Sequence, residues 1–292
     1  MSDLRAPRAL LARLEAVRAA VPTAESIARD PVRFPRRYVA LRDVEVSAVL
    51  SALLAFGRVD LFGPVIERGH ALFDAHGGPA AFVERFDDHA ADTLSAMSYR
   101  WNRPADFALL FRTLQAVYAR HDSLGALFVP GSARDTLGGA IDALRGYAPG
   151  HTRGFGTWLP HPGDGSACKR WLMLMRWMVC HDDVDLGRWS HLSPRDLVIP
   201  LDTHVMRLSR FLGLTRRNDA GWRTAEEVTA GLRRLDPDDP VRFDFALAHL
   251  GISGACKGHR DAEVCPTCPL DEICRAPAAK RLAPLRRSAQ AS

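Results

Sequence analysis

The stretch PGDGSACKRWLMLMR, residues 162–176, joins a glycine-rich turn to a helix. Pro162, Gly163 and Gly165 predict a tight turn, and Ser166 is a suitable N-cap for the helix that follows. Small residues in such a turn let backbone N–H groups come close to an anion, and the positive end of a helix adds to that attraction. The turn is therefore a candidate anion site.

Lys169 lies in the first turn of this helix. Lys169, Met173 and Arg176 share one helix face, apart from the densest apolar stripe of Trp171, Leu172, Met175, Met178 and Val179. The helix dipole disfavours an ammonium at this end, and a neutral, partly desolvated amine is a good nucleophile for Schiff-base chemistry. A solvent-exposed lysine at a helix end fits the same pattern, so both interpretations stay open.

The segment IPLDTHVMRLSRFLG, residues 199–213, predicts a second helix start. Asp202 is placed as its N-cap, with Leu201 and Met206 as a hydrophobic staple. A cap without chemistry explains an aspartate here. A cap beside a cleft can also face a substrate cation, because a carboxylate held by backbone amides stays ionised.

A cysteine-rich segment, CKGHRDAEVCPTCPLDEIC, occupies residues 256–274. Its intervals of eight, two and five residues suit a [4Fe–4S] cluster, which needs four thiolates around a large core. Structural zinc sites usually pair two short steps across a spacer, so zinc is the lesser alternative, followed by unmetallated core thiols. The expected ligands are Cys256, Cys265, Cys268 and Cys274, whereas Cys168 and Cys180 are interpreted as ordinary buried thiols.

Helical spacing recurs along the rest of the chain, and alternating strand patterns bounded by hairpin turns are scarce. Helices are expected near residues 9–17, 43–56, 64–76, 104–121 and 224–235. Asp43 is expected to cap one of them, and Thr224 with Glu227 predicts a capping box on another. The fold class is therefore all-α.

Composition is that of a globular protein, with 47% hydrophobic and 25% charged residues among 292. The formal net charge of +5 equals the charge of residues 275–292, so the body before that tail is balanced. The tail is either a frayed terminus or a loose phosphate-binding arm. Without a signal-like start or a long apolar run, we expect a cytoplasmic, nucleoid-associated protein with no membrane contact.

These signals together resemble the helix-hairpin-helix DNA glycosylases. PLDTHVMRL, residues 200–208, is similar to the endonuclease III segment that carries the catalytic aspartate, which maps to Asp202. CPTCPLDEIC, residues 265–274, is similar to the last three cluster ligands of that family, including the Cys-Pro-Leu of adenine glycosylases. GSACKR, RWMV and IPLDTHV resemble, more closely, an uncharacterised bacterial family of unknown function within this superfamily, over residues of about 30 to 274.

The chain departs from the endonuclease III pattern at three points. Its hairpin is PGDGSACK instead of Leu-Pro-Gly-x-Gly-x-Lys, and the first cysteine interval is eight instead of six. Lys169 and Asp202 are separated by 32 residues, a gap that resembles the archaeal 8-oxoguanine glycosylases, which lack the cysteine loop. These departures concern the substrate and the role of the lysine more than the role of Asp202.

The resemblance implies a mechanism on double-stranded DNA that contains a damaged base. Lys169 would attack C1′ and form a Schiff base, Asp202 would assist, and an oxidised base, 8-oxoguanine first, would leave. Trp158 or Phe155 would contribute to the base pocket unless they pack in the core, and Lys257 and Arg260 would meet the DNA backbone. The residues expected to contact DNA are Gly163, Gly165, Ser166, Arg170, His204 and Arg207.

The expected architecture has two helical lobes with the DNA cleft between them. Residues 42–184 would form one lobe that ends in the hairpin, and 1–41 with 185–292 the other, with the cluster. We expect a monomer. The alternatives are a non-catalytic protein that binds damaged or branched DNA, a monofunctional glycosylase that uses Asp202 alone, and a zinc-stabilised helical regulator.

Overall fold

The computed structural model describes residues 7–278, and the part of the tail from 279 onward lies outside the described residues. The fold is all-α, as predicted: the described residues contain helices and isolated β-bridges but no strand. No helix among them is long and apolar enough to cross a membrane. The α-helices are α1 (Pro7–Ala20), α2 (Thr23–Arg29), α3 (Leu41–Leu54), α4 (Val59–Ala75), α5 (Pro79–Glu84), α6 (Asp88–Asp92), α7 (Pro104–Tyr118), α8 (Ala133–Tyr147), α9 (Arg153–Gly156), α10 (Lys169–Val179), α11 (Thr203–Phe211), α12 (Trp222–Arg233) and α13 (Asp244–Ile252).

Short 3₁₀ turns connect several of these helices. They are η1 (Pro31–Arg33), η2 (Pro35–Arg37), η3 (Thr93–Ala96), η4 (Leu124–Leu127), η5 (Pro162–Asp164), η6 (Pro194–Asp196), η7 (Cys265–Thr267) and η8 (Asp271–Ile273). The last two lie in the cysteine-rich segment. They give that segment local turns without a helix of its own.

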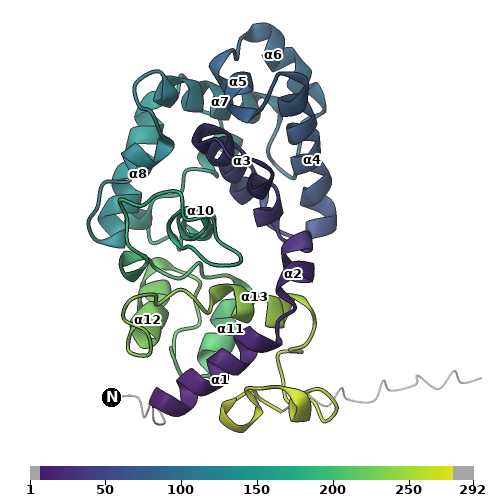
Figure 1. The fold of residues 1–292 in the computed structure, drawn as a ribbon, viewed down its shortest axis with the longest axis vertical. Helices are drawn as coiled ribbons and strands as arrows, with labels where there is room; N and C mark the ends of the chain where they lie inside the picture. The colour runs from purple at the N-terminus through teal and green to yellow at the C-terminus, as the bar shows by residue number, and fades with distance from the viewer. Residues whose placement is uncertain (1–6, 279–292) are drawn as a thin grey trace, which may run out of the picture.

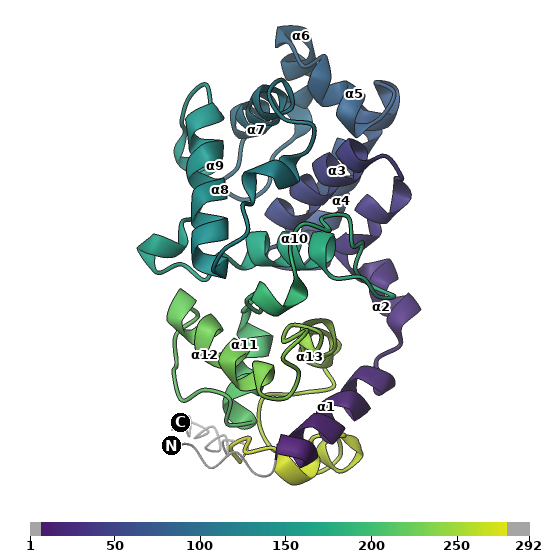
Figure 2. The same ribbon diagram turned by 60° about the vertical axis from the view of Figure 1, so that its left-hand side comes forward.

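Helix α10 lies at the middle of the molecule (Figures 1 and 2). Helices α3 to α9 occupy one half of the view, and α1, α11, α12, α13 and the cysteine-rich segment occupy the other. Every residue of α10 from Trp171 to Val179 is buried, because helices from both halves cover it. A helix that is buried on all sides fixes the positions of the side chains at its start.

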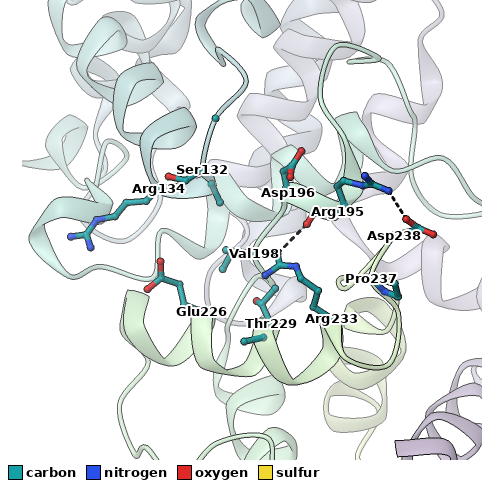
Figure 3. A pocket seen from close by; sticks show the side chains of 13 residues that line it. Ser132, Arg134, Arg195, Asp196, Val198, Glu226, Thr229, Arg233, Pro237 and Asp238 are labelled. Carbon is teal, nitrogen blue, oxygen red and sulfur yellow. Dashed lines mark hydrogen bonds and ion pairs between the residues drawn. The ribbon is translucent and has the colours of Figure 1, made fainter.

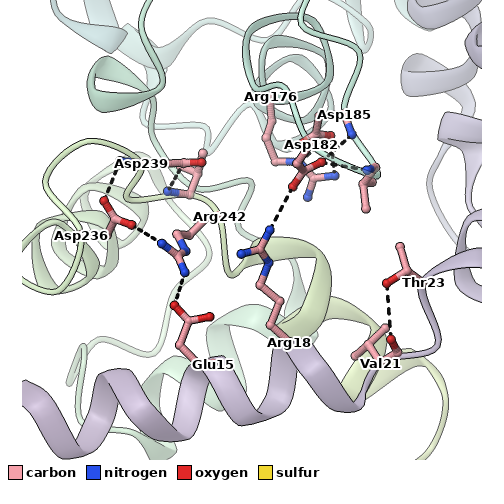
Figure 4. Close-up of polar contacts among 12 residues, drawn as sticks. Glu15, Arg18, Val21, Thr23, Arg176, Asp182, Asp185, Asp236, Asp239 and Arg242 are labelled. Atoms are coloured by element: carbon pink, nitrogen blue, oxygen red, sulfur yellow. Dashed lines mark hydrogen bonds and ion pairs between the residues drawn. The ribbon is translucent and has the colours of Figure 1, made fainter.

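The N-terminal helix α1 is attached by ion pairs to the half that contains α13 (Figure 4). Glu15 pairs with Arg242, whose guanidinium also contacts Asp236 at 2.6 Å. Arg18 lies 3.6 Å from Asp182, in the segment after α10. These contacts attach α1 to residues on both sides of the expected lobe boundary after residue 184, so the expected grouping of residues 1–41 with 185–292 stays a prediction.

Three predicted helix caps are wrong. Asp43 lies inside α3, and its Oδ1 accepts a hydrogen bond of 2.8 Å from the backbone N–H of Ala80, so it caps α5 instead. Thr224 lies inside α12, where its hydroxyl donates to Asp219, and Gly221 is the N-cap. Ser166 precedes α10 by three residues, because Cys168 is the N-cap.

Candidate active site

A cleft of about 1120 Å³ opens beside α10, and both predicted catalytic residues line it. Its walls come from α2, the α3–α4 connection, the first two turns of α10, the start of α11, and α13. Lys169 and Asp202, separated by 32 residues in sequence, therefore share one cavity. Because the walls come from both halves of the molecule, the cavity exists only in the folded chain.

Lys169 is the first residue of α10, as the sequence predicts. It is half-buried, and Met173 and Arg176 follow it along the cleft wall, so the predicted helix face is confirmed. Its Nζ contacts the sulfur of Met173 at 3.7 Å and pairs with no carboxylate of the described residues. The amine therefore faces the cavity.

Lys169 is also chemically unusual in this chain. Of the 39 basic residues in the sequence, only three are lysine: Lys169, Lys257 and Lys280. Arginine stays protonated in proteins, whereas a lysine amine can lose its proton and act as a nucleophile. The presence of a lysine at the cleft, in a chain that otherwise uses arginine, indicates a chemical role for its amine. The spacing and periodicity of the sequence do not contain this signal.

Asp202 is the N-cap of α11, as predicted. Its Oδ1 accepts hydrogen bonds of 2.8 Å from the backbone N–H groups of both His204 and Val205. Its Oδ2 accepts none from the described residues and is not sealed in the interior. The cap thus fixes one carboxylate oxygen and leaves the other available to a ligand.

A buried ion-pair network adjoins these two residues and was not predicted from the sequence. Arg176 donates to Asp244, which begins α13, and to Asp185, which follows α10, at 3.1 Å. Burial raises the pKa of Asp244 to about 6 and that of Asp185 to about 7, although Arg176 opposes both shifts. Arg176 and Asp244 line the cleft, whereas Asp185 does not.

The backbone N–H groups of both glycines in the hairpin donate hydrogen bonds within the hairpin itself. The N–H of Gly163 donates to Nδ1 of His161 at 2.9 Å, and the N–H of Gly165, in left-handed conformation with φ 80°, donates to Pro162 at 3.2 Å. The N–H of Ser166 donates to no acceptor among residues 7–278, whereas Ala167 follows the antiparallel bridge between Ser166 and Gly221 and is buried. Of the three predicted hairpin positions, Ser166 therefore keeps a backbone N–H available to an anion, whereas Gly163 and Gly165 do not.

Among the other residues predicted to contact DNA, Arg170 is used inside the protein. Its guanidinium donates to the carbonyls of Leu53 and Thr157 and lies over the ring of Phe56. Burial lowers the pKa of Arg170 to about 10. This side chain therefore connects α10 with α3 instead of facing solvent.

His204 and Arg207 lie on α11 near the cleft and the cysteine-rich segment. His204 lines the cleft, and its Nδ1 is 3.3 Å from the guanidinium of Arg207. Arg207 also contacts the carbonyl of Cys256 at 3.4 Å. Arg207 thus joins the site helix to the cysteine-rich segment.

The aromatic residues proposed for a base pocket belong to the core. Trp158 and Phe155 are 0% and 1% exposed, and Trp158 packs edge-on against Phe107. The aromatic side chains on the cleft side are different ones. Phe56 lines the cleft and stacks on Trp101, with 5.1 Å between the centroids of the two rings. Trp101 is 51% exposed.

The four clustered cysteines are reduced, and all are half-buried. Burial raises the pKa of Cys268, and charge on Cys274, Cys256 and Cys265 raises it further, so the four thiols lie near one another. In residues 7–278, however, no three His, Cys, Asp or Glu side chains converge on a point where they could hold one metal ion. The four thiols therefore lie near one another, but they do not surround a single point at which one metal ion could bind.

Basic residues inside the cysteine-rich segment hold its own turns. Arg260 donates to the carbonyls of Asp271 and Cys274 at 2.9 and 2.7 Å, and Lys257 pairs with Asp261 at 2.8 Å. Both side chains thus make contacts within the segment, and their expected contact with the DNA backbone stays a prediction. Cys168 and Cys180 are buried elsewhere, as predicted.

A second cavity, of about 690 Å³, lies between the start of α8 and α12 (Figure 3). Arg134, Arg195 and Arg233 face it together with Asp196, Glu226 and Asp238, so opposite charges are balanced. Arg195 pairs with Asp238 at 2.6 Å. None of the predicted site residues lines this cavity, and the chemistry-bearing groups belong to the larger cleft.

Comparison with known proteins identifies a family but no activity. The model of the DUF2400 family, described as a protein of unknown function, matches residues 30–253. That range includes the hairpin, Lys169, Asp202 and Asp244, and ends before the four clustered cysteines. Neither curated proteins nor solved structures provided a match.

Proposed function

Because the chain belongs to the DUF2400 family, whose description assigns no function, we propose one from the site: a base-excision DNA glycosylase with strand-cleaving lyase activity. The observation that carries the proposal is the shared cleft of Lys169 and Asp202. Lys169 Nζ has no carboxylate partner, and Asp202 Oδ2 accepts no hydrogen bond from the described residues. An amine and a free carboxylate oxygen in one cleft are the groups that imine-forming base removal requires.

The proposed reaction begins with a damaged nucleotide rotated out of the duplex into the cleft. Lys169 Nζ attacks C1′ of the sugar as the base leaves, and Asp202 stabilises the positive charge that develops on the sugar ring. The resulting Schiff base allows β-elimination of the strand. A cavity of about 1120 Å³ has room for an extruded nucleotide. The substrate proposed first is 8-oxoguanine, and an oxidised pyrimidine is second.

The surrounding structure supports the same proposal. The proposed lobes are residues 42–184 and 1–41 with 185–292, and the separation of the described helices on either side of α10 supports this division. The free N–H of Ser166 would hold a DNA phosphate, a contact that orients the duplex without reading its sequence. Double-stranded DNA with a damaged base is the proposed partner.

We also propose that Cys256, Cys265, Cys268 and Cys274 hold a structural [4Fe–4S] cluster. The intervals of eight, two and five residues suit four thiolates around the large core of such a cluster better than a structural zinc site, which usually pairs two short steps. The bound cluster would supply folding free energy to this segment. Arg207 and Arg260 would hold the backbone carbonyls around it.

Borohydride trapping tests the enzymatic proposal. Purified wild type, Lys169→Ala and Lys257→Ala would be incubated with labelled duplexes that contain 8-oxoguanine, an oxidised pyrimidine or an abasic site. We expect a covalent adduct with wild type and Lys257→Ala, at least about 100-fold less with Lys169→Ala, and Lys169 as the modified residue in the peptide map. Lys257 is the matched control, because its amine pairs with Asp261 outside the cleft.

Other results would replace the proposal. Base release without any adduct would identify a monofunctional glycosylase that uses Asp202. Selective binding to damaged or branched duplexes, with no base release at stoichiometric protein, would identify a non-catalytic DNA-binding protein.

A further inference from the structure

The floor of the cleft contains a second carboxylate, Asp244, with one oxygen free. Its Oδ2 accepts a hydrogen bond from Arg176, whereas its Oδ1 accepts none from the described residues and is not sealed in the interior. Asp244 is 5% exposed and lines the same cleft as Lys169 and Asp202. Lys169, Asp202 and Asp244 thus share the walls of one cleft, and the charges of Lys169 and Asp202 both act on Asp244.

The groups around Asp244 contain more acids than cations. Arg176 on α10 pairs with both Asp185 and Asp244, Asp202 adds a third carboxylate, and the amine of Lys169 is neutral when it attacks. Nearby on the same cleft, Asp30 pairs with His249 on α13 at 3.3 Å, and Asp30 also acts on Arg176. An excess of one buried carboxylate is costly, so the network tends to bind a proton.

Hydrogen-bond geometry determines which oxygen of Asp244 can carry that proton. The guanidinium of Arg176 is a donor only, and it occupies Oδ2. A proton on Asp244 therefore belongs on Oδ1, the oxygen that no protein donor reaches. Asp202 differs, because two backbone N–H groups donate to its Oδ1. Two carboxylates with such unlike surroundings suit an acid and an anion in one reaction.

We propose that Asp244 is the acid that protonates the departing base, an inference that rests on the proposed glycosylase function. Lys169 Nζ forms the new bond to C1′ while the N-glycosidic bond breaks and its electron pair goes to the base. Asp244 Oδ1 gives its proton to the base nitrogen, so a neutral base leaves and Asp244 becomes a carboxylate. The new secondary ammonium on Lys169 balances that charge, and solvent returns the proton to Asp244.

The test separates base release from imine formation, because an abasic site has no base to protonate. Wild type, Asp244→Asn and Asp185→Asn are compared in single turnover on 8-oxoguanine and oxidised-pyrimidine duplexes, and by borohydride trapping on an abasic duplex. Asp185 is the matched control: it binds the same guanidinium at similar burial but does not line the cleft. Asparagine keeps an acceptor for Arg176 in both variants.

We expect Asp244→Asn to release base about 100-fold more slowly than wild type at pH 6, while its adduct on the abasic duplex stays within a few-fold of wild type. Asp185→Asn should stay near wild type in both assays. In wild type, the ratio of base release to adduct formation on the abasic duplex should fall as the pH rises above about 6, the pKa to which burial raises Asp244. The ratio cancels the titration of the attacking amine, which both reactions need, and it requires no variant to fold.

The remaining outcomes overturn the inference. Equal loss of base release and adduct in Asp244→Asn would indicate a structural role, and unchanged base release would exclude the acid. A ratio of base release to abasic adduct in wild type that is flat from pH 5 to 8 would exclude it independently. Adducts on the abasic duplex with no base release from either lesion would also overturn it, whereas no adduct at all would overturn the lysine mechanism itself.

Discussion

Asp202 combines a structural contact with a free carboxylate oxygen, and two substitutions can separate the two roles. Asp202→Asn keeps an oxygen that accepts from His204 and Val205, whereas Asp202→Ala removes the cap. We expect the alanine variant to lose about 1 kcal/mol in free energy of unfolding and the asparagine variant much less. Both should lose at least about 100-fold in adduct formation, because neither presents a negative charge to the sugar.

Urea unfolding and the trapping assay together measure these two effects. An asparagine variant that is stable and as active as wild type would show that the cap is the whole role of Asp202. A variant that is stable and inactive would place the function in the charge.

At this scale, sequence reasoning succeeded where the neighbours in sequence set the geometry. The first-turn position of Lys169 and the cap at Asp202 follow from a few adjacent residues. Asp244 could not be found in this way, because its partner Arg176 lies 68 residues earlier in the sequence. The burial of Asp244 depends on how the helices that carry the two residues pack together. Trp158 and Phe155 could not be assigned for a related reason, since aromatic residues serve cores and ligand pockets equally well.

Helices α3 and α4 are joined by a buried histidine that makes their contact sensitive to acid. His70 Nε2 bonds Ser47 at 2.7 Å, and Nδ1 bonds the carbonyl of Ile66 at 2.9 Å. Burial lowers the pKa of His70 from its usual 6.5 to about 4. The unfolded chain therefore binds a proton more readily, and the stability present above pH 6.5 is lost as the pH falls toward 4.

We expect the free energy of unfolding of wild type to fall more between pH 7 and pH 5 than that of His70→Phe, by about 2 kcal/mol. Phenylalanine fills the same apolar site, beside Phe34, without a proton to bind. Urea unfolding at the two pH values measures the difference. Parallel losses in both proteins would show that other groups cause the acid sensitivity.

The elements themselves were predictable to different degrees. Long amphipathic segments, including those of α3, α7 and α10, gave correct helices because periodicity extends over several turns. Asp43 was misassigned because its carboxylate caps a helix that begins 36 residues later, at Pro79. Glu45 is another contact of this kind: fully buried in α3, it accepts from Trp189, Tyr118 and the backbone of Leu124.

In the whole molecule, the cleft arises from segments that no local pattern connects. Helix α2, the turn after α3, the start of α10, the cap of α11 and α13 all contribute to its walls. The sequence indicated two of these parts but not their convergence, which depends on how the two halves pack on α10. The all-α class was predictable because it needs only the sum of local helix signals.

The cysteine-rich segment is the part of the molecule with the smallest core of its own. Within residues 256–274 only Leu270 is fully buried, and polar contacts from Arg260 and Arg207 hold the turns. Apolar burial of one side chain contributes roughly 2 kcal/mol, which does not offset the conformational entropy of ordering the whole segment. A bound cluster would supply the difference.

Removal of one ligand should therefore affect the fold of this half of the molecule as well as its colour. We expect the wild type to be brown with about four iron atoms per chain, and Cys268→Ser to be insoluble or colourless. Cys180→Ala is the control, because Cys180 is buried at the end of α10, away from the cluster ligands. Visible absorption and metal analysis decide the question: a soluble, coloured and fully active Cys268→Ser would refute the cluster, and stoichiometric zinc in wild type would replace it with a single-metal site.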